Sequence, residues 1–353
     1  MPACLHIIKN AQPECTGITR LVTSLARHSE PLGYNVKVLF LGDGPLLETV
    51  RHAGIRASAV SWTASRRDLA GAWRVWRWLR KHPAQIVHVH HGGTAVRIIC
   101  RMAGTRAFVQ HVHSRILEPE GGSISQLSFR GADAVVACSQ AVADCVRGSH
   151  PEVIYSGVET GSEPPSPPDC AGPLTVGILT RLIPLKNVEA VIKAAACLAR
   201  RDIGIHVEIA GTGPSEPALH ELAKSLAVTD RVHFLGWQTD IPSLMKNWDL
   251  LAIPSLEEGV PISALEAMAA ARPVVASRIG GLGELVVDGV TGMLLAPNDT
   301  EALVACLANL AGDRRKLILM GREGWTRARE DFSAELMARR TTELYDRLLN
   351  PTM

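Results

Sequence analysis

The sequence predicts an α/β protein of two domains, each built on a parallel sheet. Its 353 residues are many for one domain and natural for two of roughly 150 residues each. Short apolar runs, such as residues 174–179 and 249–253, end at turn residues and lead into helical patterns, as buried parallel strands do. The proline-rich run 163–169 can neither pair in a sheet nor continue a helix. We therefore expect an N-terminal domain at 1–163, a linker at 164–171 and a C-terminal domain at 172–333.

Composition excludes several classes of protein. With 46% hydrophobic residues and a mean hydropathy of +0.11, the chain is globular and not disordered. No run approaches the ~18 uncharged apolar residues of a membrane span, and no basic leader precedes the first apolar strand, so we expect a cytoplasmic protein. The eight cysteines form no CxxC pair, which indicates reduced thiols.

Charge is unevenly divided along the chain. Residues 1–165 hold 18 Lys and Arg against 12 Asp and Glu, whereas the remainder holds 19 against 23. A basic N-terminal half favours an anionic partner on that side, such as a phospholipid surface or a diphosphate carrier.

Two carboxylates, Glu258 and Glu266, lie eight positions apart around a predicted helix start. Glu258 falls in the loop after the strand 249–253, and Pro261 suits a first helical position because it has no N–H to leave unsatisfied. Ligands of open parallel sheets bind beyond the strand carboxyl ends, where a helix N-terminus favours an anion. Two acids so placed can hold different hydroxyls of one extended ligand, or they can simply favour the helix N-terminus electrostatically.

Two cations, Arg181 and Lys186, follow the strand 174–179 and precede a helix that starts near Asn187. Cations spaced in this way can straddle a diphosphate and neutralise the charge that grows on it as a leaving group departs. The alternative for either residue alone is a solvated loop charge.

Two features of the N-terminal half are candidates for ligand binding. Gly17, at the first strand-to-helix turn, lets a phosphate approach the backbone, although an ordinary turn fits equally well. Five histidines lie at the ends of two neighbouring strands: His88, His90, His91, His111 and His113. They predict either a metal cluster or, preferably, a polar lining of a cleft between the domains, because their spacing matches no catalytic zinc motif. We expect no bound metal.

A predicted helix over 66–81 interleaves tryptophan with arginine. Trp73, Trp76 and Arg80 share one face, and such a pattern suits the headgroup region of a membrane. A crossover helix that packs its tryptophans on the sheet is the equal alternative. Nucleic acid is not an expected partner, because no recognised reader motif accompanies the charge.

The segment Glu258-Gly259-Val260-Pro261 to Leu265-Glu266-Ala267-Met268 resembles the Glu, seven residues, Glu signature of the retaining nucleotide-sugar glycosyltransferases of family 4. That resemblance implies the GT-B fold, in which two Rossmann-like domains face each other across a cleft. It also implies that the first acid binds hydroxyls of the donor sugar and the second binds the nucleotide ribose. The chain departs from the family at Pro261, where most members carry glycine, and this change removes one backbone donor.

The resemblance extends to further residues. It implies that Arg181 and Lys186 hold the donor diphosphate, that His113 lies near the donor sugar and acceptor, and that a last helix, 334–353, returns to the N-terminal domain. Gly17 stands where family members carry a Gly-Gly pair facing the diphosphate. Trp237 either contacts the base or packs in the core. The remaining expected donor contacts are Gly211, Gly236, Gly259, Val260, Pro261 and Ile262.

These observations predict a retaining, metal-independent glycosyltransferase. It is expected to move a hexose-type sugar from a UDP- or GDP-sugar to a glycan or polyprenyl diphosphate-linked acceptor in surface polysaccharide assembly. The donor is a substrate, and no cofactor is expected. We also expect peripheral contact with the inner membrane surface. The alternatives are a GT-B protein that binds a nucleotide sugar without transferring it, and a nucleotide-sugar epimerase.

Overall fold

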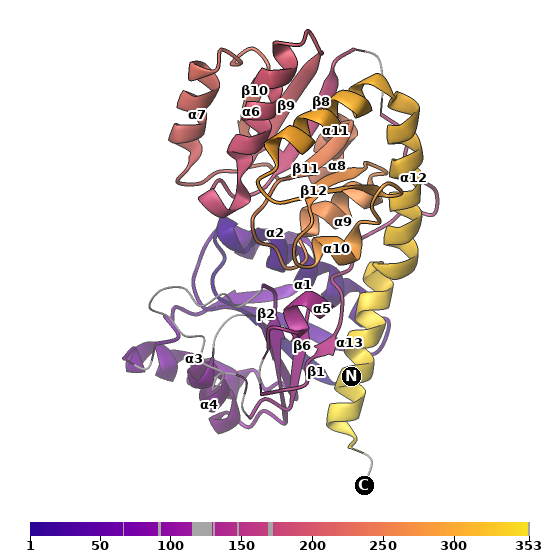
Figure 1. Ribbon diagram of the computed structural model, residues 1–353. Helices are drawn as coiled ribbons and strands as arrows, with labels where there is room; N and C mark the ends of the chain where they lie inside the picture. Colours follow the sequence, from indigo (N-terminus) through magenta and orange to yellow (C-terminus); the bar gives the residue numbers. More distant parts are fainter. Residues whose placement is uncertain are drawn as a thin grey trace. The chain divides into compact units, whose positions relative to one another are not determined.

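The computed structural model describes residues 1–65, 67–90, 93–114, 129, 131–146, 148–168 and 172–351 (Figure 1). Among the residues discussed above, Arg66, His91 and the last three linker residues, 169–171, lie outside this range. The chain divides into two compact units, which we call the N-terminal unit (Met1–Gly157 with Ala334–Met353) and the C-terminal unit (Val158–Ser333).

The N-terminal unit contains one parallel sheet, whose described strands run in the order β3-β2-β1-β4-β5-β6-β7. This is a doubly wound order that reverses between β1 and β4. The strands are β1 (Ala3–Ile8), β2 (Asn35–Phe40), β3 (Arg56–Ala59), β4 (Ile86–Val89), β5 (Ala107–Val112), β6 (Ala134–Ala137) and β7 (Glu152–Val153). The described helices are η1 (Pro13–Cys15), α1 (Thr16–Ser29), α2 (Leu46–His52), α3 (Leu69–Lys81), α4 (Thr94–Met102), α5 (Gln140–Ala143) and α13 (Ala334–Leu349).

The C-terminal unit repeats this order as β10-β9-β8-β11-β12-β13, with the reversal between β8 and β11 (Figure 1). Its strands are β8 (Leu174–Leu179), β9 (Ile205–Ala210), β10 (Val232–Gly236), β11 (Leu250–Ile253), β12 (Val274–Ser277) and β13 (Gly292–Leu295). Its described helices are η3 (Pro184–Lys186), α6 (Val188–Ala199), α7 (Glu216–Ser225), α8 (Ile241–Lys246), α9 (Ile262–Ala269), α10 (Leu282–Leu285), α11 (Thr300–Gly312) and α12 (Arg314–Asp331). The prediction of two parallel-sheet α/β domains is confirmed.

Each sheet has its own apolar core. In the C-terminal unit, α6 and α11 cover the same side of the sheet, and their inward residues Val191, Ile192 and Leu307 are fully buried. Trp248 is also fully buried. A Cβ at Gly177 of β8 would lie 1.9 Å from its ring, so only glycine fits at position 177. Its indole N–H donates to Glu208 Oε2 at 2.8 Å, which satisfies the one polar atom of the side chain.

The boundary between the units falls at 157/158, whereas the sequence placed it at 163/164. Two arginines of the C-terminal unit explain the difference, because Arg329 donates to the carbonyl of Ser162 and the buried Arg272 donates to that of Ser166, each at 3.1 Å. The first part of the proline-rich segment is thereby held as part of the C-terminal unit. At the other end, α13 belongs to the N-terminal unit, where it packs on α1.

The fully buried residues of helix α3 include none of its three tryptophans. Gly71, Val75 and Leu79 are its buried residues, whereas Trp73 is 55% exposed and Trp76 is partly exposed. Small and aliphatic residues therefore fill the contact with the sheet, and only Trp78 packs beside that core. The alternative in which the tryptophans as a group pack on the sheet is wrong. None of the helices in the described part of the chain is both long and apolar enough to cross a membrane.

Candidate active site

Two loops of the C-terminal unit meet where its strand order reverses. Strands β8 and β11 are neighbours in the sheet, and the loops that follow them carry Lys186 and Glu258. Ligands of open α/β sheets bind in the crevice beyond the strand carboxyl ends at such a reversal. The backbone N–H of Leu256 donates to the carbonyl of Leu185 at 2.8 Å, which ties the two loops together.

Lys186 and Glu258 form an ion pair at this reversal point. Lys186 Nζ lies 2.5 Å from Glu258 Oε1, and the hydroxyl of Ser255 donates to the same oxygen at 2.9 Å. The two charged side chains are only 16% and 11% exposed. The structure thus brings a predicted cation and a predicted acid together, and it adds Ser255, which the sequence interpretation missed.

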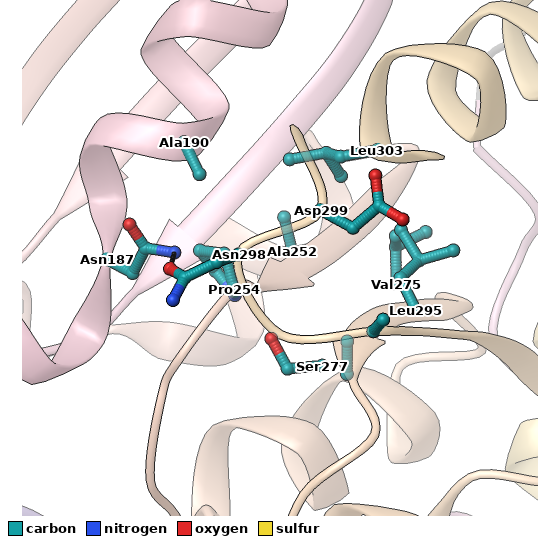
Figure 2. A pocket seen from close by; sticks show the side chains of 12 residues that line it. Asn187, Ala190, Ala252, Pro254, Val275, Ser277, Leu295, Asn298, Asp299 and Leu303 are labelled. Atoms are coloured by element: carbon teal, nitrogen blue, oxygen red, sulfur yellow. Dashed lines mark hydrogen bonds between the residues drawn. The ribbon is translucent and has the colours of Figure 1, made fainter. Parts of the chain in front are cut away.

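Two asparagines support the turn that carries Lys186. Asn187 adopts a left-handed conformation with φ of 48°, and Asn298 does the same with φ of 61°. Their side chains lie next to each other in the lining of a small pocket, and Asn187 Nδ2 donates to Asn298 Oδ1 at 3.3 Å (Figure 2). The cavity of ≈ 20 Å³ has room for about one water molecule. Asparagine tolerates the left-handed conformation better than most residues. Asparagines at positions 187 and 298 are therefore the sequence feature that could have predicted these two turns.

The loop that carries Arg181 is held by a glycine turn. Leu182 donates to the carbonyl of Thr212 at 3.0 Å, and a Cβ at Gly211 would lie 1.8 Å from the carbonyl oxygen of Thr180. The contact that explains Gly211 is therefore close backbone packing. Arg181 itself is exposed, and within the described residues no hydrogen bond or ion pair fixes its guanidinium, so its predicted contact with a diphosphate stays a prediction.

The segment from Gly259 to Glu266 forms the entry to α9. Pro261 is the residue just before the helix and not its first residue, so the donor that proline lacks lies outside the helix. Ile262 begins α9, whose first backbone N–H groups have no partner within the helix and give this end a positive partial charge. The carbonyl of Gly259 lies 2.3 Å from where a Cβ at Gly281 would stand, while the next residue, Val260, is buried. Glu266 is partly buried one turn into α9.

Gly236 and Trp237, two expected donor contacts, lie at the end of β10. Gly236 adopts a φ of 67°, and its carbonyl accepts from the N–H of Gly211 at 2.7 Å. Trp237 is 40% exposed, so the alternative of packing in the core is wrong for this side chain. Contact with a nucleobase stays a prediction.

Gly17 and His113 belong to the N-terminal unit. Gly17 is the second residue of α1, so the expected glycine turn before the helix is instead part of its first turn. His113 directly follows β5 and is partly buried, and its Nε2 lies 2.8 Å from Nδ1 of His90.

Three of the other predicted histidines, His88, His90 and His111, are buried, and His91 lies outside the described residues. His88, His90 and His111 are at most 6% exposed, and two groups that the sequence analysis did not connect with them, His6 and Tyr345, complete the cluster. Burial lowers the pKa of His6 to about 3 and holds those of His88, His90 and His111 well below the ordinary value. The nitrogens of two histidine triplets approach one another closely enough to be considered for a metal: His6, His88 and His90, and His90, His111 and His113.

Comparison with known proteins identifies the family. A model described as "Glycosyltransferase Family 4" matches residues 16–162, and one described as "Glycosyl transferases group 1" matches residues 173–313. The chain belongs to the glycosyltransferases of GT-B type. This glycosyltransferase is 27% identical to the lipopolysaccharide core biosynthesis mannosyltransferase LpsB of Rhizobium meliloti, over 97% of each chain.

Two further likenesses are more limited. The D-inositol 3-phosphate glycosyltransferase of Salinispora tropica is 36% identical over 48% of this chain, and the match spans 37% of that protein, so the glycosyltransferase covers little more than a third of its relative's length. The structure of Anabaena Alr3699/HepE in complex with UDP-glucose has the same fold, with a TM-score of 0.83 and 22% identity, covering 98% of this chain and 100% of that one.

Proposed function

We propose that the protein is a retaining glycosyltransferase that moves a hexose-type sugar from a UDP- or GDP-sugar to a glycan or polyprenyl diphosphate-linked acceptor. The observation that carries the proposal is the Lys186–Glu258 pair at the β8/β11 reversal point, beside the positive end of α9. A cation and an acid joined there suit a ligand that has a diphosphate and a polyhydroxyl part. Likeness to LpsB supports a role in surface polysaccharide assembly.

In the proposed reaction, Glu258 holds hydroxyls of the donor sugar and Glu266 holds the ribose. The bond between the anomeric carbon and the donor phosphate oxygen breaks, and a bond to the acceptor oxygen forms on the same face. The acceptor proton moves to a phosphate oxygen of the leaving nucleotide. Arg181, Lys186 and the amides at the start of α9 stabilise the leaving diphosphate, so we expect transfer without a divalent metal. The donor is consumed, and no cofactor takes part.

A surface of the N-terminal unit suits the proposed lipid-linked acceptor. Four apolar side chains on α3 and α4 are unusually exposed: Leu69 (75%), Trp73 (55%), Ile98 (48%) and Met102 (63%). The indole of Trp76 donates to the carbonyl of Met102 at 3.4 Å, which joins the two helices. The exposed cations Arg77 and Arg80 adjoin them on α3. We propose peripheral contact with the inner, cytoplasmic face of an anionic membrane through this surface.

Glu258→Gln tests the proposed function most directly. The change keeps the shape of the side chain but removes the negative charge, and we expect transfer from a UDP- or GDP-sugar to fall ~100-fold. Binding of the nucleoside diphosphate alone should be retained, because Glu258 is assigned to the sugar. Glu189→Gln is a matched control, since Glu189 forms an exposed ion pair with Lys193 on α6.

Other outcomes of this assay separate the alternatives. Donor binding with no transfer to any lipid-linked or free glycan would favour a non-catalytic binding protein. A new donor epimer formed without acceptor would favour an epimerase, and a sugar covalently attached to Glu258 would overturn same-face attack.

A further inference from the structure

Six groups of the N-terminal unit form one continuous hydrogen-bonded chain, which we call the histidine chain. His113 Nε2 lies 2.8 Å from His90 Nδ1, and His90 Nε2 lies 2.8 Å from His6 Nδ1. His6 Nε2 lies 3.3 Å from the hydroxyl of Tyr345, which lies 2.6 Å from His88 Nδ1. His88 Nε2 then lies 3.2 Å from His111 Nδ1. The chain uses both ring nitrogens of each of its inner histidines.

The sheet register and α13 build this chain together. Strands β1 and β4 pair so that His6 stands beside His88, and His88 and His90 lie on the same face because side chains alternate along a strand. Strand β5 places His111 and His113 on that face as well, since its neighbour β4 pairs with it residue by residue. Tyr345, on α13, covers this face and joins the two arms through its hydroxyl.

The rings in one arm meet edge to edge. Ring centres of His6 and His90 lie 5.1 Å apart with planes inclined by 21°, and those of His90 and His113 lie 5.0 Å apart with planes inclined by 23°. Because each pair of nitrogens is only 2.8 Å apart, the bonding nitrogens must lie between the ring centres. This is the geometry of a hydrogen bond in which an N–H points at a ring lone pair.

The same geometry argues against a metal ion between these rings. Zinc binds imidazole along the nitrogen lone pair at about 2.0–2.1 Å. Two nitrogens that face each other at 2.8 Å leave no room for an ion on that line, so a metal would require the rings to turn. A shared proton fits the rings as they stand.

Neutral imidazoles make the chain cooperative. Burial depresses the pKa values of His6, His88, His90 and His111, so each carries one N–H and one lone pair at neutral pH. If His90 donates from Nδ1 to His113, its Nε2 must accept from Nδ1 of His6. If instead His113 donates from Nε2 to His90, then His90 must donate from Nε2 to His6. Only these two arrangements satisfy both bonds.

We propose that the histidine chain fixes the tautomer of His113. His6, His90 and His113 carry their protons on the same ring nitrogen, all on Nδ1 or all on Nε2, and His6, His90 and Tyr345 are positioning residues for His113. The proposal rests on the proposed function and deepens it, because the family resemblance implies that His113 lies near the donor sugar and acceptor. A fixed tautomer gives an incoming hydroxyl a hydrogen-bonding partner of one polarity.

The two ends of the histidine chain differ in their exposure, as expected if the chain fixes the tautomer of His113. His113 is partly buried at the carboxyl end of β5, the edge of the sheet at which ligands bind. At the other end, His111 Nε2 is inaccessible and has no hydrogen-bond partner among the described residues. Reversing the histidine chain from the Nδ1 to the Nε2 arrangement shifts one proton within every bond, releases one proton from His113 Nδ1 and requires another at His111 Nε2. Because that nitrogen is inaccessible, the reversal is hindered and the arrangement stays fixed.

Nitrogen-15 NMR of histidine-labelled full-length protein at pH 7.5 tests the proposal, since ring nitrogen shifts distinguish the two tautomers. We expect His6, His90 and His113 each to be in a single tautomer, and the same one. A wild-type spectrum in which any two of them differ, or in which His113 is an equal mixture, would overturn the proposal. The nitrogen-15 spectrum needs neither a substrate nor a variant, so its result does not depend on whether the protein transfers sugar.

Tyr345→Phe and Tyr34→Phe form a matched pair of variants. Tyr345→Phe removes the hydroxyl that joins the arms, and we expect the tautomer populations of His6, His90 and His113 to change together. Tyr34→Phe removes a nearby hydroxyl that donates to Asp346 at 2.6 Å, from a ring centred 5.5 Å from that of Tyr345, and should leave them unchanged. A change at His6 without a change at His113 would contradict the coupling.

Two further measurements complete the test. In a transfer assay, Tyr345→Phe should lower kcat with little change in donor KM, whereas equal activity of both tyrosine variants would contradict a positioning role. Zn²⁺ added to the full chain should not bind stoichiometrically at these rings. Stoichiometric Zn²⁺ binding that is lost in His90→Asn would assign the cluster to a metal and overturn the proposal.

Discussion

Glu258 illustrates how a single carboxylate can be held ready for a ligand. One of its oxygens accepts from both Lys186 and Ser255, at 2.5 and 2.9 Å, while most of the side chain is shielded from water. Charge-assisted bonds of this kind are stronger than those between neutral groups, and they orient the carboxylate before a donor arrives. Any ligand hydroxyl that binds Glu258 thus meets an acceptor whose position is already fixed.

The pairing of Lys186 with Glu258 predicts a non-additive stability effect. Lys186→Met leaves a mostly buried carboxylate without its cation, and we expect the free energy of unfolding to fall by about 2 kcal/mol. Adding Glu258→Gln should recover part of that loss, because the uncompensated charge is then gone. Urea unfolding at pH 7.5 measures both.

Lys193→Met provides the control for this cycle. Lys193 pairs with Glu189 at 3.5 Å on an exposed face of α6, and such pairs contribute less than about 1 kcal/mol. Additive losses in the Lys186 and Glu258 double variant would show that the two residues do not interact in solution.

At the scale of elements, the buried histidines of β1, β4 and β5 make the N-terminal unit sensitive to acid. The pKa values of His6, His88, His90 and His111 are lowered by burial, so the unfolded chain binds more protons than the folded one below about pH 6.5. Their neutral state is fully compatible with folding above that pH. Stability is lost as the pH falls toward the depressed folded values, by up to about 1.4 kcal/mol per pH unit for each imidazole.

Urea unfolding at pH 7.5, 6.5 and 5.5 checks this dependence. The midpoint should fall slightly between pH 7.5 and 6.5 and several times more between pH 6.5 and 5.5. The carboxyls with lowered pKa values, Asp68, Asp240 and Asp288, titrate below their ordinary value of 3.8 and so leave this window to the histidines. An unchanged midpoint at pH 5.5 would mean that the histidines are already accessible in the folded state.

The surface of α3 and α4 makes a second prediction at this scale. Replacing Leu69 and Trp73 by serine removes two of its most exposed apolar side chains and should reduce flotation with vesicles of anionic phospholipid at least several-fold. Binding of the unaltered protein should also weaken at high salt, because the neighbouring cations contribute. Leu319→Ser, at a 54% exposed site on α12, is the control. Equal flotation of the double variant and the control would show that this surface does not bind the membrane.

Apolar runs and turn residues predicted most of the helices and strands. They could not predict contacts between residues that lie far apart in the sequence. The strand before Arg181 and the strand and helix around Glu258 follow from apolar runs and turn residues, which act over short range. The pairing of His6 with His88 depends on sheet register, and its link to Tyr345 spans 339 residues. Neither follows from periodicity. The tryptophan and arginine pattern of α3 left two alternatives equally open, and the buried face made of Gly71, Val75 and Leu79 became clear only from tertiary packing.

At the scale of the molecule, the same sheet order occurs twice, and each reversal point carries a different kind of chemistry. In the C-terminal unit, the loops after β8 and β11 carry the Lys186–Glu258 pair. In the N-terminal unit, β1 and β4 at the reversal carry His6 and His88, which are neutral. At its reversal point the C-terminal unit thus carries a cation and a carboxylate, whereas the N-terminal unit carries uncharged hydrogen-bonding groups at its own. This division is consistent with a charged donor and a hydroxyl acceptor.

The division of charge leads to a prediction about metal dependence. If Arg181, Lys186 and the start of α9 are sufficient to stabilise the diphosphate, the matching nucleotide sugar should bind equally well with EDTA or Mg²⁺. At about 100 times its Kd the ligand should add about 2.7 kcal/mol to the free energy of unfolding, which a thermal shift across a panel of UDP- and GDP-sugars would detect as several degrees. Arg181→Ala should reduce that shift, because it removes one cation from the binding loop and breaks no hydrogen bond or ion pair among the residues that the structure describes. Arg201→Ala, at an exposed residue beyond α6, should not. A thermal shift that appears only with Mg²⁺ would show that a metal ion, and not the two cations alone, stabilises the diphosphate.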